Sequence, residues 1–311
     1  NRFAPFLRCV GLYVIAFLLS VFGFAFKAAE WPKLGEALRV SSIGVLVLAF
    51  LIHLAGLFVR MDLMNYTLVF VTNLYSSAIF IGCGCVGLGL VLEKIFPIGI
   101  SAIVASALGV ATTIVAHNLA TEDTLEMMQA VLDTNFWLAT HVTTVTLGYT
   151  ATFVAGFLGA AYAFLMFCSV IRDSFTTAGP PTPERLLAYG GAALGIVFLP
   201  MSVGWVLFDA LAKFEQIPSV LGEVMRYGMI AAGGVYFILL LVSRAGADGV
   251  DAHGKPTATP IPRFAKPVVA MGLTPQLTKV LGQMIYGVIA FATVLSFIGT
   301  VLGGIWADQS W

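Results

Sequence analysis

The chain has 311 residues, of which 59% are hydrophobic and only 10% are charged. Soluble proteins carry about 25% charged residues, so this composition excludes an ordinary water-soluble domain. Sixteen Lys and Arg residues balance sixteen Asp and Glu residues, and this zero net charge gives no general attraction for nucleic acids. The sequence therefore predicts a polytopic membrane protein.

Long apolar stretches recur along the whole chain, and a transmembrane helix needs about 20 mostly apolar residues. Eight such stretches are found at 9–28, 41–60, 67–92, 97–116, 141–171, 187–211, 225–243 and 283–306. Their apolar residues do not alternate with polar ones, as they would in strands of a β-barrel. We expect an all-α bundle of about eight transmembrane helices, forming a single transmembrane domain over residues 1–311.

The connecting segments predict the orientation of this bundle. The loops 29–40, 93–96, 172–186 and 244–282, together with Lys27, carry eleven Lys and Arg residues, and the opposite side carries five. The positive-inside rule places the richer set in the cytoplasm and both termini on the outer, periplasmic side. The polar, proline-rich segment 244–267 then becomes a cytoplasmic linker. Segment 117–140 has four acidic residues and no Lys or Arg, which agrees with an outer position.

Few residues in this chain are suited to chemistry, and His141 stands at the start of the fifth span. Neutral imidazole at the membrane surface is a suitable axial ligand for haem iron, although a hydrogen-bonded interfacial histidine is the simpler explanation. Trp137, Trp306 and Trp311 fall near the same predicted surface. They are typical of interfacial anchors, and they would also suit the walls of a porphyrin site.

His53 lies within the second span and needs a partner there, since an unpaired buried polar group costs a few kcal/mol, on the order of 2–7. Metal ligation, proton relay and a hydrogen bond to a carbonyl of an adjacent helix all remain open. The chain has no HExxH, CxxC, P-loop or dinucleotide-binding motif, which disfavours a soluble-type hydrolase. The four cysteines lie in apolar runs, and we expect them to be inert packing residues.

Three segments carry a more specific pattern. Residues 53–60 have the sequence HLAGLFVR, and residues 71–77 have the sequence VTNLYSS. Residues 135–149 place Trp137, His141 and Tyr149 in the pattern W-L-x-x-H-V followed by Tyr, and residues 303–311 have the sequence GGIWADQSW. Taken together and in this order, they resemble the CcsA/ResC family of cytochrome c biogenesis proteins, part of a haem-handling group with a tryptophan-rich WWD motif.

This resemblance implies a role in cytochrome c maturation, with haem presented at the outer face for covalent attachment to apocytochrome c. It implies haem b as cofactor and His141 as a ligand of the haem iron, with cofactor contacts from Trp137, Trp306, Trp311 and His53. The implied partners are a CcsB-like membrane subunit and apocytochrome c, and the implied location is the bacterial inner membrane. Whether the chain forms part of a holocytochrome c synthase (haem lyase) stays open.

The chain departs from the family pattern at several points. Ser76 stands where the family usually has Glu. The rest of the WWD motif and a second outer histidine would follow Trp311, so the sequence ends at the start of that motif. The long separation between His141 and Trp311 indicates an inserted helical pair near 187–243.

Two other functions remain open on the sequence alone. One is a non-enzymatic structural subunit or transporter-like component of a membrane complex. A transporter usually has broken helices or charges within the membrane, and the only candidates for these are Pro200 and Asp209. The other is an electron-transfer protein with His53 and His141 as paired haem ligands, although no second histidine pair is present to carry electrons across the bilayer.

Overall fold

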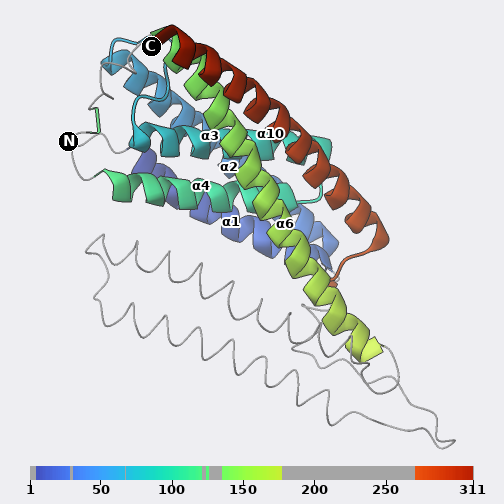
Figure 1. Cartoon of the computed structure of the whole chain (residues 1–311). Coiled ribbons are helices and arrows are strands. Elements are labelled where there is room, and N and C mark those ends of the chain that lie inside the picture. Colours follow the sequence, from blue (N-terminus) through green and yellow to red (C-terminus); the bar gives the residue numbers. More distant parts are fainter. Residues whose placement is uncertain are drawn as a thin grey trace, which may run out of the picture. The chain divides into compact units, whose positions relative to one another are not determined.

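The computed structural model describes residues 5–28, 31–66, 68–120, 124–125, 135–176 and 270–310. Within these ranges the regular secondary structure is entirely helical, without strands (Figure 1). The elements are α1 (Pro5–Ala28), α2 (Pro32–Leu63), α3 (Leu74–Ile95), α4 (Ile100–Leu119), α5 (Asn135–Trp137), the π-helical turn η2 (Leu138–Val142), α6 (Thr143–Thr176) and α10 (Pro275–Ser310). Six of these helices are long and apolar enough to cross a membrane.

The six long helices overlap six of the predicted spans, which confirms the all-helical membrane architecture. The predicted spans 187–211 and 225–243 and the linker 244–267 lie outside the described residues, so the total of eight spans and the sides of the termini stay predictions. Helix α2 begins nine residues before the predicted 41–60 stretch, at Pro32, because proline fits the first turn of a helix. Helix α3 begins at Leu74 rather than at 67, because Asn73 caps it.

The chain divides into two compact units. The first contains residues 1–27, 31–161 and 278–311, and the second contains residues 28–30 and 162–277. In the first unit α3 and α4 approach closely: a Cβ atom built on Gly89 would lie only 2.4 Å from Cβ of Ala105. In the second unit the Ser169 hydroxyl accepts a hydrogen bond from the Leu273 amide (2.6 Å), which ties the turn before α10 to α6.

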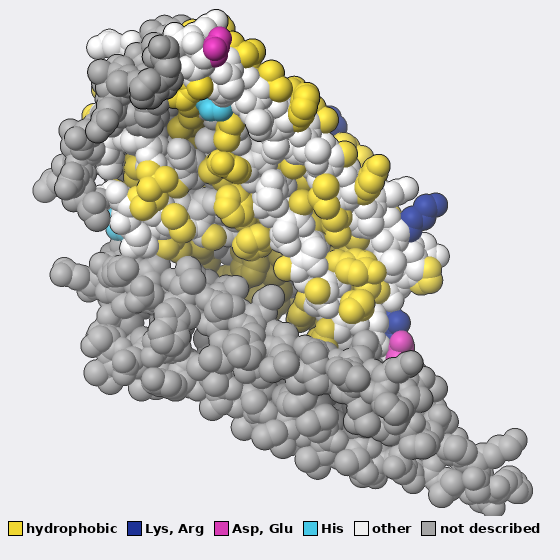
Figure 2. Space-filling view, viewed as in Figure 1, with side chains coloured by type: hydrophobic (Ala, Val, Ile, Leu, Met, Phe, Trp, Pro, Cys, Tyr) yellow, Lys and Arg dark blue, Asp and Glu magenta, His cyan; other side chains and the backbone are white. Residues whose placement is uncertain are grey.

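Most of the helical surface is apolar. Figure 2 shows hydrophobic side chains spread over the visible face of the described helices, with charged side chains few and near its margins. Large residues such as Tyr286 and Phe297 on α10 are more than two-thirds exposed. The four cysteines are free and buried, as expected of packing residues. An outward-facing apolar surface of this kind is what a lipid environment requires.

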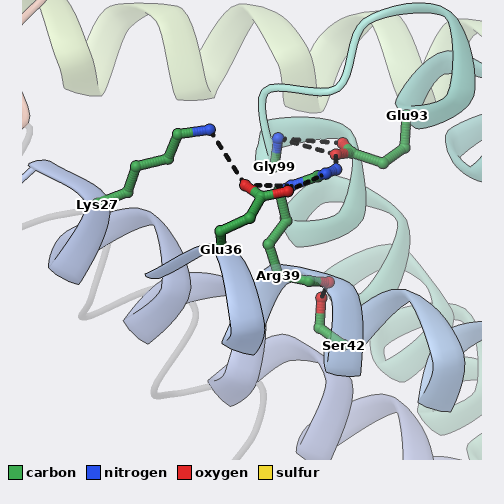
Figure 3. Close-up of polar contacts among 6 residues, drawn as sticks. All are labelled: Lys27, Glu36, Arg39, Ser42, Glu93 and Gly99. Atoms are coloured by element: carbon green, nitrogen blue, oxygen red, sulfur yellow. Dashed lines mark hydrogen bonds and ion pairs between the residues drawn. The ribbon is translucent and has the colours of Figure 1, made fainter. Parts of the chain in front are cut away.

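One charged network ties α1, α2 and α3 together (Figure 3). Arg39 on α2 donates hydrogen bonds to Glu36 and to Glu93 on α3 (2.7 Å to Glu93), and Lys27 on α1 pairs with Glu36 (3.4 Å). Glu93 is almost fully buried and also accepts the backbone N–H of Gly99, at the N-terminus of α4. A carboxylate favours that position because helix N-termini expose unpaired N–H groups.

Candidate functional site

His141 lies in a π-helical turn, η2, between the short α5 and the long α6. Such turns carry one residue more per hydrogen-bonded loop than an α-helix does, and they occur frequently at functional sites. The side chain of His141 is partly exposed, not enclosed in the core. The sequence predicted a histidine at a helix start, and the structure places it there.

The imidazole of His141 is held by α10. Its Nδ1 atom lies 2.9 Å from the backbone oxygen of Gly299. A carbonyl oxygen can only accept, so Nδ1 carries the proton when the ring is neutral. The other nitrogen, Nε2, is then unprotonated and available as an acceptor or metal ligand. Metal-binding histidines commonly donate their second N–H to a backbone carbonyl in this way.

The backbone of Gly303 packs closely against the same ring. A Cβ atom built on Gly303 would lie 2.7 Å from Cε1 of His141 and 3.3 Å from its Nδ1. Real Cβ contacts are not that short, so any larger residue at 303 would displace the imidazole or the helix. Sequence reasoning missed Gly299, and it used Gly303 only as part of the C-terminal motif, not as a neighbour of His141. Their i, i+4 spacing on an apolar helix is typical of close helix–helix contacts in membranes and could have indicated them.

Trp306 lies beside His141, one turn beyond Gly303. The two ring centroids are 5.6 Å apart, and the planes are inclined at 44°. The indole Nε1 of Trp306 is buried and makes no hydrogen bond with any part of the chain that the structure describes. A buried donor without a partner costs about 1–3 kcal/mol of folding free energy. A ligand with a hydrogen-bond acceptor at this position would satisfy the N–H group.

Trp137 has its ring contact with another aromatic residue and not with this pair. Trp137 is half-buried and makes an edge-to-face contact with Phe136, with ring centroids 5.0 Å apart. Trp311 lies outside the described residues. Within the described ranges no group of three His, Cys, Asp or Glu residues converges. The arrangement can therefore supply a single imidazole to a metal that brings its other ligands with it.

His53 belongs to a different cluster. It is fully buried on α2, and its Nδ1 lies 2.8 Å from the hydroxyl oxygen of Tyr13 on α1. Phe6 packs against it edge-on, with ring centroids 5.2 Å apart. A Cβ on Gly82 of α3 would lie 3.5 Å from its Cε1. Its contacts are thus with α1 and α3, whereas those of His141 are with α10.

The rest of the first sequence motif converges on the end of α2. Arg60 lies over the ring of Tyr75, 5.1 Å from its centroid, and donates to the backbone oxygen of Thr124. Asn73 donates to the same oxygen through Nδ2 (3.0 Å). Asn73 and Ser76 also form a reciprocal capping box at the start of α3. This motif therefore joins α2, α3 and the segment after α4.

The six long apolar helices of the described ranges define a polytopic helical membrane protein. Residues 71–311 match the family model of the cytochrome C assembly protein. The match covers more than half of the chain, so the chain belongs to the cytochrome c assembly protein family, and its role lies in cytochrome c biogenesis. Comparisons with curated proteins and with solved structures gave no match.

Proposed function

We propose that this protein presents haem at the outer membrane face for covalent attachment to apocytochrome c, with His141 as a ligand of the haem iron. The observation that carries the proposal is the arrangement of His141 and Trp306. The imidazole is anchored through Nδ1 to Gly299, and Nε2 makes no hydrogen bond with a described residue. Family membership independently supports haem handling.

The residues present fit haem on three counts. A neutral Nε2 atom can coordinate iron. The indole of Trp306 supplies an aromatic surface beside it, which favours a flat macrocycle. The buried Nε1–H of Trp306 supplies a hydrogen-bond donor for an acceptor such as a carboxylate. Trp137 and Trp311 would extend the aromatic surface, and His53 would act only as a more distant cofactor contact.

In this reaction the protein would orient the haem relative to apocytochrome c. Haem supplies the vinyl groups that bond to the cysteine thiols of apocytochrome c. His141 would fix the position of the iron, Trp306 would restrict the tilt of the ring, and the neighbouring apolar helices would limit access of water. Haem b, a CcsB-like partner subunit and the bacterial inner membrane complete the proposal, and they follow from the resemblance of the motifs.

The test compares two histidine variants of the purified protein. We expect the wild type to show a haem absorption spectrum, and His141→Ala to lose both the spectrum and cytochrome c maturation. Added imidazole should partly restore the spectrum. His117→Ala is the matched control, because His117 is an exposed histidine at the end of α4. A wild type without haem, or a His141→Ala variant with an unchanged spectrum, would refute the proposal.

A structural subunit is the second candidate, and one observation favours it. The bond between His141 and Gly299 ties α6 to α10, which is a packing role in its own right. On that account His141→Ala should lower the thermal stability of the protein and leave its haem content unchanged. The same pair of purified variants therefore separates the two functions.

A further inference from the structure

The contact between His141 and α10 is one step of a longer seam. Three pairs of residues face each other across α6 and its preceding turn on one side and α10 on the other: His141 with Gly303, Val145 with Gly299, and Gly148 with Ser296. From one pair to the next, the residue number rises by four and then three on the α6 side and falls by four and then three on α10. This is the pattern of two antiparallel helices in a single register, and Figure 1 shows α6 and α10 running side by side.

Each step of the seam is closely packed. A Cβ on Gly299 would lie 2.7 Å from Cγ2 of Val145, and a Cβ on Gly148 would lie 3.3 Å from Oγ of Ser296. Shifting α10 by one turn in either direction would place Ala307 opposite His141 or Leu295 opposite Val145. Either residue carries a side chain where the present register has none, so the glycines hold α10 in this register.

The register also sets the chemistry of the imidazole. The acceptor for Nδ1 is the carbonyl of Gly299, and Gly303 packs against the ring. Trp306 lies on the same helix, so a displacement of α10 moves the acceptor, Gly303 and the indole together. A ring without this acceptor could adopt either tautomer and could turn about its χ angles.

We infer that Gly299 and Gly303 are positioning residues, which fix His141 as the Nδ1–H tautomer, with Nε2 unprotonated, and hold its imidazole beside Trp306. The inference rests on the proposed function only in taking Nε2 as the ligand atom. The tautomer and the position of the ring are properties of the protein without haem. Substitutions along the seam should therefore change His141 before any ligand is added.

The direct test is nuclear magnetic resonance of haem-free protein in which only histidine is labelled with ¹⁵N and ¹³C. The chain has four histidines, so single His→Gln variants can assign every signal. The spectra are recorded at about pH 8, where the free imidazole of a model peptide is neutral. We expect the His141 signals of the wild type to be those of the Nδ1–H tautomer.

The variant to compare is Gly303→Ala, and Gly304→Ala is its matched control. Both add one methyl group to neighbouring glycines of α10, but a Cβ on Gly304 would meet nothing within 4 Å. We expect Gly303→Ala to shift the His141 signals or mix the two tautomers, and to weaken haem binding about 10- to 100-fold, as loss of an orienting partner typically does. Gly304→Ala should resemble the wild type in both.

The outcomes separate this inference from the proposed function. If the wild type shows the Nδ1–H tautomer but binds no haem, the positioning role is supported and the proposed haem site is refuted. The Nε2–H tautomer in the wild type would overturn the positioning role, and so would equal His141 spectra for the two alanine variants. Should Gly303→Ala fail to fold, the wild-type tautomer alone decides.

Discussion

The hydroxyl oxygen of Tyr13 lies 2.8 Å from Nδ1 of His53, and both side chains are fully buried. The phenol O–H donates and Nδ1 accepts when His53 is the Nε2–H tautomer, the opposite of the tautomer inferred for His141. This bond provides a partner for one nitrogen of an intramembrane histidine, whereas the other, Nε2, is buried and makes no hydrogen bond with the described residues. The bond joins α1 to α2, and a Cβ built on Gly82 of α3 would contact the same imidazole.

Removing that hydroxyl group should cost stability and leave haem binding unchanged. We expect Tyr13→Phe to lower the free energy of unfolding by about 1–3 kcal/mol, because Nδ1 of His53 is left buried without a donor. Thermal unfolding in detergent measures the change. Tyr286→Phe is the control, since Tyr286 is 77% exposed. A haem spectrum of Tyr13→Phe with altered iron ligation would instead place His53 at the haem iron, not at a more distant contact.

Ser76 stands at the third position of α3, where the resembled family usually has Glu. Its hydroxyl accepts the backbone N–H groups of Thr72 (2.8 Å) and Asn73 (2.9 Å). Glutamate at the third position of a capping box accepts the same kind of N–H. Serine therefore performs the backbone-capping part of that role, although it brings no negative charge.

Loss of this cap should be measurable in a single substitution. We expect Ser76→Ala to destabilise the protein by about 0.5–2 kcal/mol, as removal of a capping side chain does. Ser77→Ala should have a smaller effect, because the Ser77 hydroxyl only donates to the Asn73 carbonyl and leaves no N–H group unpaired when removed. Chemical or thermal unfolding of both variants gives the comparison. Equal losses would show that the bonds accepted by Ser76 contribute little.

Local patterns made much of the fold predictable, because a run of about 20 apolar residues specifies a membrane helix without reference to its neighbours. The position of His141 at a helix start was predictable for the same reason. Its pairing with Gly299 and Gly303 was not, since a contact between residues more than 150 positions apart depends on how α6 and α10 pack. The π-turn that carries His141 has no sequence signature that we could use.

The carbonyl of Thr124 receives hydrogen bonds from both Arg60 and Asn73, so these two motif residues hold the segment after α4. Asn73→Asp tests this bond, because aspartate keeps the oxygen that caps α3, loses the N–H donor and brings a negative charge towards the Thr124 carbonyl. In a Thr124→Cys background we expect Asn73→Asp to speed maleimide labelling of the new cysteine severalfold. The four native cysteines are buried and should react slowly.

The matched control in that background is Asn118→Ala, another asparagine near the same end of the bundle. Its amide donates to the carbonyl of Ile114 in its own helix and not to Thr124. Its labelling rate should equal that of the Thr124→Cys parent. If Asn73→Asp also labels at the parent rate, the Asn73 bond does not hold this segment.

The charged network around Arg39 allows a direct comparison of a buried and an exposed ion pair. The side chain of Glu93 is only 2% exposed, pairs with Arg39 and accepts a hydrogen bond from the N–H of Gly99. In the exposed pair, the side chains of Lys27 and Glu36 are 45% and 44% exposed. Removing one member of a buried pair leaves an uncompensated charge and costs about 3–5 kcal/mol. An exposed pair contributes about 0–1 kcal/mol.

We therefore expect Glu93→Leu to destabilise the protein strongly and Lys27→Gln to change it little. Unfolding temperatures in detergent at low and high salt measure both effects. The Lys27 effect should disappear in high salt, because exposed charges are screened within about 3 Å at 1 M ionic strength, and the Glu93 effect should persist. The double variant Arg39→Leu with Glu93→Leu should recover part of the loss, since the mostly buried guanidinium no longer lies between α2 and α3 with only Glu36 as its partner. A double variant as unstable as Glu93→Leu would show that the contact of Glu93 with Gly99, and not its pairing with Arg39, dominates.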